Sequence, residues 1–155
     1  MSFVVSALPA EPFGPLFALS DEALAAQGAL RRTVDAKPGF PCRVSLEDAE
    51  PGETVLLLNY EHQPADTPFR ARHAIYVRNG APQAELAPGQ LPPVFRDRIL
   101  SLRAFDEVGM LRAAEVAQGE AVQPAVERLL AKPEVAYLHA HYAGMGCYAA
   151  RIDRA

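Results

Sequence analysis

Short runs of alternating or β-branched residues, bounded by Gly, Pro, Asn and Asp, recur along the chain and are typical of β-strands. The stretch Met110–Ala117 also fits a helix, but no convincing cap precedes it, so we favour a strand. The last two runs flank the turn Ala143-Gly144-Met145-Gly146, which predicts a C-terminal β-hairpin. Strands are expected at Ser2–Leu8, Leu30–Val34, Thr54–His62, His73–Arg78, Ile99–Phe105, Met110–Ala117, Val135–Tyr142 and Cys147–Asp153.

The run Thr54–His62 is the most apolar in the chain, and the rest of the prediction is organised around it. Its first residues are apolar on both faces, whereas Asn59–His62 at its end are polar. This pattern indicates a central strand that leaves the core at its C-terminal end. A constrained loop, Pro38–Gly52, leads into the strand. We therefore expect the loop and the strand end to hold side chains at fixed positions.

Two short helices are expected beside these strands. Ser20 is a suitable N-cap for the first, which Gly28 ends. The second runs from about Val122 to Ala131, carries an apolar stripe, and stops at Lys132-Pro133. The elements predict a single α+β domain over residues 1–155, with a mostly antiparallel or mixed sheet, two short helices and a C-terminal β-hairpin.

Composition and charge exclude several classes of protein. The 155 residues are 50% hydrophobic and 22% charged, which is ordinary for one globular domain. A net charge of −4 and a pI near 5.5 argue against binding to nucleic acid or to a membrane surface. No apolar run approaches the ~18 residues of a membrane span. The N-terminus lacks a basic region before its apolar run, so we expect a strand there rather than a signal peptide, and a cytoplasmic protein by default.

Several motifs together resemble one protein family, and the resemblance covers nearly the whole chain. The motifs are Pro41–Ala49 followed by Pro51-Gly52-Glu53, then Pro68-Phe69-Arg70, Ile75–Arg78 and Gly146–Arg154. The family is a bacterial domain of unknown function, number 1203 (DUF 1203). The resemblance implies a small single-domain bacterial protein. It also implies that the segments around Cys42-Arg43, Phe69-Arg70 and Gly146-Cys147 are family features, but it supplies no chemistry.

The two cysteines, Cys42 and Cys147, are expected to be free thiols, as is usual in a reducing compartment. Catalysis by a thiol needs a neighbour that lowers its pKa or takes its proton. Cys42 with His62 or His139 as the base is one hypothesis. The alternative is that both cysteines are small buried hydrophobic residues. The sequence therefore leaves open whether the protein is an enzyme.

Arginines gather in the two loops that flank the predicted central hairpin. Guanidinium groups bind carboxylate or phosphate with paired hydrogen bonds, and a tyrosine hydroxyl can add another. This grouping predicts a pocket for a small anion. The alternative is that the arginines form structural ion pairs with nearby carboxylates. The predicted ligand-binding residues are Arg43, Tyr60, Arg70, Arg72, His139 and His141.

His139 and His141 are two apart in a predicted strand, so both rings project from one face. Such a pair could form a metal clip with His62 as third ligand, while Glu61 and His73 are weaker choices. A lone His-x-His pair is common by chance in strands. We therefore assign no metal and no cofactor from the sequence.

The register of the C-terminal hairpin decides where Cys147 lies. A two- or four-residue turn sets Tyr142 opposite Cys147 and places the thiol on the face away from both histidines. A three-residue turn would set it opposite His141. The simpler register excludes Cys147 from a site with the histidines.

These observations favour the binding of a small anionic ligand or a protein partner where Cys42-Arg43, Tyr60–His62 and Arg70–Arg72 converge. One alternative is a cysteine-dependent enzyme using Cys42 with a histidine base. Another is a structural or homodimeric interaction module that pairs through a sheet edge and has no catalytic site. No Gly-rich phosphate loop, GxSxG, HExxH or CxxC motif occurs. We expect no nucleic-acid and no membrane partner.

Overall fold

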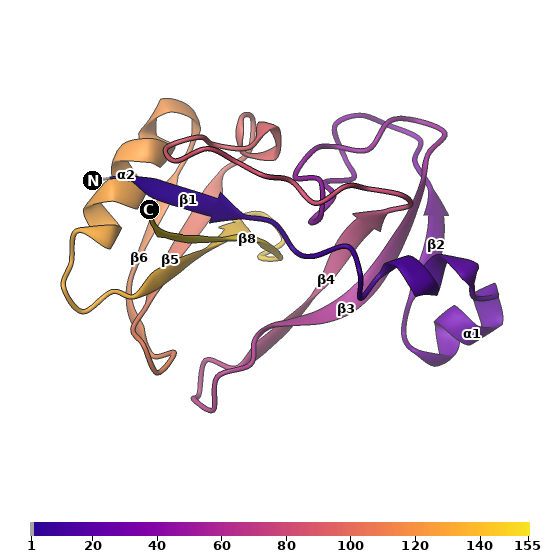
Figure 1. Ribbon diagram of the computed structural model, residues 1–155, viewed down its shortest axis with the longest axis horizontal. Helices are drawn as coiled ribbons and strands as arrows, with labels where there is room; N and C mark the ends of the chain where they lie inside the picture. Colours follow the sequence, from indigo (N-terminus) through magenta and orange to yellow (C-terminus); the bar gives the residue numbers. More distant parts are fainter. Residues whose placement is uncertain (1) are drawn as a thin grey trace.

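The computed structural model describes residues 2–155, which form two β-sheets and two short α-helices (Figure 1). The larger sheet has the strand order β1-β8-β7-β5-β6, and the smaller has the order β2-β3-β4. All neighbouring strands in both sheets are antiparallel. The strands are β1 (Phe3–Ser6), β2 (Leu30–Thr33), β3 (Thr54–Gln63), β4 (Ala71–Arg78), β5 (Leu100–Phe105), β6 (Leu111–Ala117), β7 (Tyr137–Tyr142) and β8 (Tyr148–Arg154).

The two helices flank the sheets at opposite ends of the molecule (Figure 1). α1 (Asp21–Ala26) begins after Ser20, whose hydroxyl accepts a hydrogen bond from the Ala23 amide at 3.1 Å. α2 (Val122–Leu130) packs its apolar stripe on the five-stranded sheet. No helix within residues 2–155 is long and apolar enough to cross a membrane. Short 3-10 segments lie at Gly14–Ala18, Pro93–Phe95 and Gly119–Ala121.

The two faces of β7 point to different parts of the molecule. Leu138, Ala140 and Tyr142 belong to the larger core, which also contains the buried side of α2. His139 and His141 alternate with them and therefore point the other way, where their rings meet residues of the smaller sheet. The histidines of β7 thus lie between the sheets.

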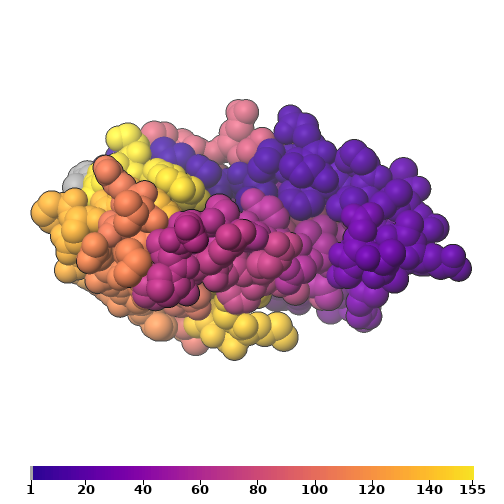
Figure 2. All heavy atoms as spheres, turned by 90° about the horizontal axis from the view of Figure 1, so that it is seen from below, coloured from indigo at the N-terminus to yellow at the C-terminus, as the bar shows by residue number. Residues whose placement is uncertain are grey.

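A second core covers one face of the three-stranded sheet and includes Tyr148 of β8, which links the two sheets. Figure 2 shows the residues of β3 and β4 crossing the middle of the lower face of the molecule, between the N-terminal segments and the five-stranded sheet. The pairs that point into this core follow the alternation predicted for β3. They are Leu56 with Val77, Leu58 with Ile75, and Tyr60 with His73.

The predicted α+β domain is confirmed, with its strands, its two helices and its C-terminal hairpin. The ambiguous stretch Met110–Ala117 forms strand β6. The Tyr142 amide donates to the Cys147 carbonyl at 2.9 Å, so these residues lie opposite each other, as the simpler hairpin register requires. The strands form two separate sheets, and β2, β3 and β4 pair only with one another.

One expectation about β3 is wrong: its C-terminal end does not leave the core. His62 and Gln63 are only 8% and 2% exposed. Residues of the five-stranded sheet cover this end, as the contacts of His62 with His141 and Tyr148 show. The polar end of the strand is therefore enclosed, where polar groups need protein partners or a ligand.

Candidate functional site

All four histidines of the chain lie between the two sheets. His62 comes from β3, His73 from β4, and His139 and His141 from β7. A β-bulge between Glu61 and Gln63 leaves His62 outside the regular pairing with β4. Bulges of this kind redirect a side chain and are frequent beside functional sites. The bulge and the alternation of β7 together aim the four rings into one space.

Three of these rings, those of His62, His73 and His141, form a compact cluster. Each offers one nitrogen, and the three nitrogens lie within 4.8 Å of one another. His62 Nε2 and His73 Nδ1 are 2.7 Å apart, with ring planes that differ by 5°. This contact needs one proton between the two nitrogens. The His141 ring stands at 81° to His62 and at 79° to His73.

The orientation of His141 is set by the turn that follows it. Its Nδ1 donates a hydrogen bond to the carbonyl of Gly146 at 2.8 Å. Gly146 has φ +79°, a conformation that glycine adopts without strain. Because Nδ1 carries the proton, Nε2 of the neutral ring has a free lone pair. That nitrogen is buried and has no hydrogen-bond partner among the described residues.

His139 lies beside the cluster rather than within it. Its ring centre is 5.9 Å from that of His62 and 6.4 Å from that of His141. Its nearest aromatic neighbours are Phe105, Tyr137 and Tyr148, each with a ring centre 5.2 Å away. The structure therefore separates the two histidines of the predicted clip into one cluster member and one flanking residue.

Burial keeps these histidines uncharged at neutral pH. Loss of hydration lowers the pKa of His62 to about 4, and the pKa values of His139 and His141 to about 3. Burial also lowers the pKa of His73, with a further contribution from the positive charges of Arg103 and Arg43. Neutral imidazole is the form that ligates metal ions. The cluster therefore presents lone pairs rather than charges.

Two hollows reach the histidines. One of about 810 Å³ has His73 in its wall together with Arg43 and Tyr142. Another of about 500 Å³ has His62 and His139 in its wall. These volumes are in the range of small-molecule sites. Small molecules therefore have room next to the cluster.

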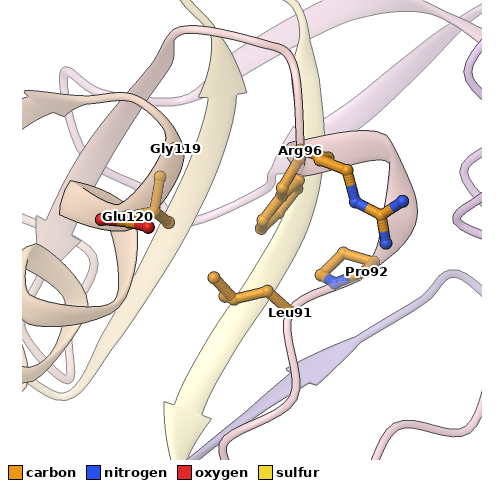
Figure 3. A pocket seen from close by; sticks show the side chains of 7 residues that line it. Leu91, Pro92, Arg96, Gly119 and Glu120 are labelled. Carbon is orange, nitrogen blue, oxygen red and sulfur yellow. The ribbon is translucent and has the colours of Figure 1, made fainter.

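A further hollow of about 370 Å³ lies away from the histidines, between the 3-10 segment Pro93–Phe95 and the start of α2. Figure 3 shows Leu91 and Pro92 on one side of it, with Arg96 nearby, and Gly119 with Glu120 on the other. Among the described residues, no buried polar atom that lacks a hydrogen-bond partner belongs to the lining of this hollow. It gives no sign of a chemical site.

Cys42 is completely buried, at 0% exposed. Its Sγ accepts hydrogen bonds from the amides of Ser45 at 3.5 Å and Arg78 at 3.3 Å. The residue packs in the second core with Val44 and Ile75. This is the environment of a buried small hydrophobic residue, the alternative that the sequence left open.

The arginines of the predicted anion pocket lie in different places. Arg43 is buried between the sheets, while Arg70 and Arg72 both contact the carboxylate of Glu61 at 3.0 Å near the surface. Tyr60 is half-buried in the second core, and burial raises the pKa of its hydroxyl. The structure brings Arg43 close to the histidines but does not bring Arg70 and Arg72 into the same hollow.

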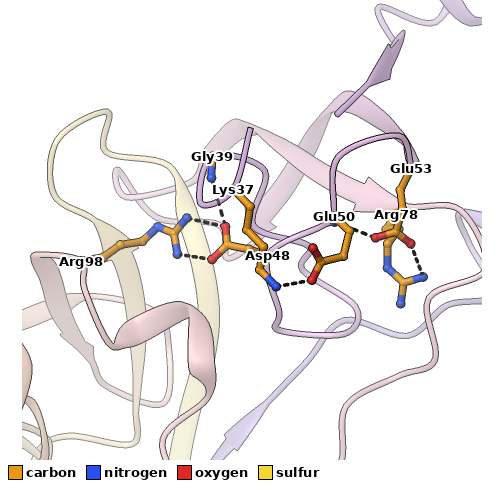
Figure 4. A network of polar contacts seen from close by, with 7 residues as sticks. All are labelled: Lys37, Gly39, Asp48, Glu50, Glu53, Arg78 and Arg98. Carbon is orange, nitrogen blue, oxygen red and sulfur yellow. Dashed lines mark hydrogen bonds and ion pairs between the residues drawn. The ribbon is translucent and has the colours of Figure 1, made fainter. Parts of the chain in front are cut away.

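Other charged residues of the loop before β3 form an ion-pair network (Figure 4). The Asp48 carboxylate accepts two hydrogen bonds from Arg98, at 2.6 Å and 2.9 Å. Arg78 contacts Glu53 at 3.2 Å. These contacts are the structural ion pairs weighed as the alternative to anion binding, and they fasten the loop to both sheets.

From the sequence, His73 ranked below His139 as a cluster member. The sequence did contain a pattern that indicates the position of His73. His73 alternates with Ile75 and Val77, so it shares their core-facing side of β4. The ring centre of Tyr148 lies 5.0 Å from that of His62, and this contact depends on how the two sheets pack because Tyr148 belongs to β8 and His62 to β3.

Comparisons with known proteins identify the family and no further relatives. Searches of curated proteins and of solved structures found no match. Residues 39–154 match DUF1203, described as a protein of unknown function. The matched range contains all four histidines and most of both sheets. The chain therefore belongs to the DUF1203 family.

Proposed function

We propose that the protein binds a divalent transition-metal ion, with Zn²⁺ as the first candidate, through His62, His73 and His141. The observation that carries this proposal is the group of three imidazole nitrogens within 4.8 Å of one another. Imidazole nitrogen suits Zn²⁺, and three protein ligands leave a fourth position for water or another molecule. The hollow beside His73 supports a fourth position that small molecules can reach.

Metal binding requires the three rings to move and turn, since their nitrogens now lie within 4.8 Å of one another and the His62 and His73 rings are nearly parallel. Zn–N bonds of about 2.0–2.1 Å in a tetrahedral site set the ligand nitrogens about 3.3–3.4 Å apart. His62 Nε2 and His73 Nδ1, now at 2.7 Å, would separate by about 0.6–0.7 Å. The proton between them would have to shift to the other nitrogen of its own ring, which leaves both facing nitrogens with lone pairs for the ion. Nε2 of His141 needs no such shift, because its ring proton is on Nδ1.

The same cluster could instead be a purely structural polar core. That reading leaves Nε2 of His141 buried without a partner. An unsatisfied buried polar group costs about 1–3 kcal/mol. A metal ion removes this cost, and the Gly146 carbonyl then accepts the hydrogen bond that a metal-binding histidine usually donates from its other ring nitrogen. The unpartnered nitrogen of His141 supports the metal site, whereas the unpartnered Nδ1 atoms of His62 and His139 are not explained by it.

The test is titration calorimetry with Zn²⁺ on chelator-treated protein. We expect micromolar or tighter binding, and a loss of at least about 100-fold in affinity for His73→Ala and His141→Gln. His73 is only half-buried, so its variant should remain folded. His139→Gln is the matched control, since it alters a buried histidine of the same strand outside the cluster. Its affinity should change by less than about tenfold.

Two results would overturn the proposal. One is the absence of Zn²⁺, Co²⁺ and Ni²⁺ binding below millimolar concentration in the wild-type protein. The other is an equal loss of affinity in the His73 and His139 variants. Co²⁺ absorption supplies an independent readout, because three histidines and a water in a tetrahedral site give intense visible bands that His73→Ala should abolish.

The remaining expectations from the sequence stand as secondary proposals. A small anionic ligand is supported at Arg43, which lies beside the cluster, rather than at the paired Arg70 and Arg72. A cysteine-dependent enzyme has no support from the buried thiol of Cys42. The two free thiols fit a reducing cytoplasm.

The edge strands β1 and β6 could pair two copies of the chain, which light scattering would detect.

A further inference from the structure

Two arginines next to the histidine cluster have no carboxylate partner among residues 2–155. Arg43 is 1% exposed, yet its guanidinium donates only to the carbonyls of Tyr148 at 2.8 Å and Pro41 at 2.6 Å. Arg103 of β5 is half-buried and donates to the Ser101 hydroxyl at 3.3 Å. Buried charges in proteins are normally paired. These two cations therefore lack counter-charges.

The carboxylate of Glu61 acts on the histidine cluster but does not neutralise Arg43 or Arg103. Glu61 raises the pKa of His62 slightly against the larger effect of burial, but its two oxygens are already engaged by Arg70 and Arg72. A divalent ion on three neutral histidines adds two further positive charges. The space around the metal would thus hold an excess of positive charge, which favours an anionic ligand.

The hollow beside His73 has mainly apolar walls. Its lining includes Leu57, Ala74, Ile99, Met145 and Cys147. Ile99 and Met145 are 49% and 94% exposed, so two large apolar side chains stand at its edge. Arg43, Arg98 and His73 also line this hollow, and of the two arginines Arg98 is paired with Asp48. One hollow therefore combines an apolar surface with a cation and a metal-binding nitrogen.

We infer that this hollow binds a small carboxylate with an apolar body, the carboxylate held on the side of His73 and Arg43 and the body against Leu57, Ile99 and Met145. The inference deepens the proposed function, on which its metal contact rests, whereas the role of Arg43 does not depend on a metal. A carboxylate offers two oxygens, which match the N–H groups of Arg43 not given to carbonyls and the unpartnered hydroxyl of Tyr142.

The first test compares two probes that share one body. We would titrate Zn²⁺-loaded protein with 4-phenylbutyrate and with 4-phenylbutanol, and use acetate and inorganic phosphate as controls. The acid should bind at least about tenfold more tightly than the alcohol, and also more tightly than acetate. Equal affinity for acid and alcohol, or tighter binding of phosphate than of the acid, would overturn the inference.

The second test alters charge at the edge of the hollow without touching the core. Met145→Asp and Met145→Lys both remove the exposed apolar side chain, so their difference isolates the charge. The aspartate variant should bind 4-phenylbutyrate about three- to tenfold more weakly than the lysine variant at low salt. Val116→Asp, on the exposed face of β6, is the control and should leave affinity unchanged. Equal affinities of the two Met145 variants would contradict the placement.

Titration of the acid into chelator-treated protein separates this inference from the proposed function. If Zn²⁺ does not bind but the acid is still preferred over the alcohol, the metal proposal fails and the carboxylate site stands on Arg43. If Zn²⁺ binds as expected and the acid is not preferred, the carboxylate inference fails and the metal site stands.

Discussion

His141 and Gly146 are joined across the turn of the β7–β8 hairpin, where the imidazole Nδ1 donates to the glycine carbonyl at 2.8 Å. This bond selects the tautomer of His141 and leaves Nε2 free beside His62 and His73. Gly146 lies at the end of this turn and adopts φ +79°. A local feature of the hairpin therefore prepares a side chain for a site that lies between two sheets.

The two glycines of this turn should respond differently to substitution. Gly146→Ala places a Cβ on a left-handed residue, and we expect the free energy of unfolding to fall by about 1–2 kcal/mol. Gly144 has an ordinary φ, and open space surrounds its Cβ position. Gly144→Ala should therefore stay within about 1 kcal/mol of wild type. Urea unfolding measures both, and equal losses would contradict the assigned role of Gly146.

Stability of the metal-free protein should depend on pH between about 6.5 and 4. The folded-state pKa values of His62 and His141, about 4 and about 3, lie below the unfolded value of about 6.5. The unfolded chain therefore binds more protons in this window, so stability falls as pH falls. The slope is at most about 1.4 kcal/mol for each buried histidine and pH unit.

Urea midpoints at several pH values, with a chelator present, measure this slope. His139→Gln removes one buried imidazole with a pKa of about 3 and should make the slope shallower. A stability that stays constant from pH 6.5 to pH 4.5 would show that the histidines accept protons in the folded protein.

The ion pair between Asp48 and Arg98 should contribute measurably to stability. Its two hydrogen bonds are partly buried, and they join the loop before β3 to the segment before β5. We expect Asp48→Asn to lower the free energy of unfolding by about 1–3 kcal/mol. Glu50→Gln, in the exposed pair with Lys37, should leave the free energy of unfolding nearly unchanged, because solvent screens exposed ion pairs. A larger effect at Glu50 would contradict this ranking.

The two thiols should differ in their reactivity toward a thiol reagent. Cys147 is partly exposed in the wall of the hollow, whereas Cys42 is inaccessible. We expect one thiol to react quickly in the native protein and the second only when the protein unfolds. Cys147→Ser should remove the fast phase. Rapid alkylation of Cys42 in the native protein would instead support the hypothesis of a catalytic thiol.

Local patterns in the sequence were sufficient for most of the secondary structure. Three of its features depend only on residues that are close in the sequence. They are the cap at Ser20, the apolar stripe of α2 and the turn before Cys147. Alternation also placed His139 and His141 on one face of β7 correctly, since side-chain direction in a strand follows from its period of two. The strand end at His62 was predicted, but its burial was not.

By itself, then, the sequence determined the α+β class, the elements and the face on which most strand residues lie outside the β-bulges, because short-range geometry controls these properties. Tertiary structure alone decided that His62 and His73 meet His141 rather than the solvent. It also decided that Arg43 is buried without a carboxylate while Arg70 and Arg72 are paired. These outcomes depend on how one sheet packs against another, which no periodicity within a single strand encodes.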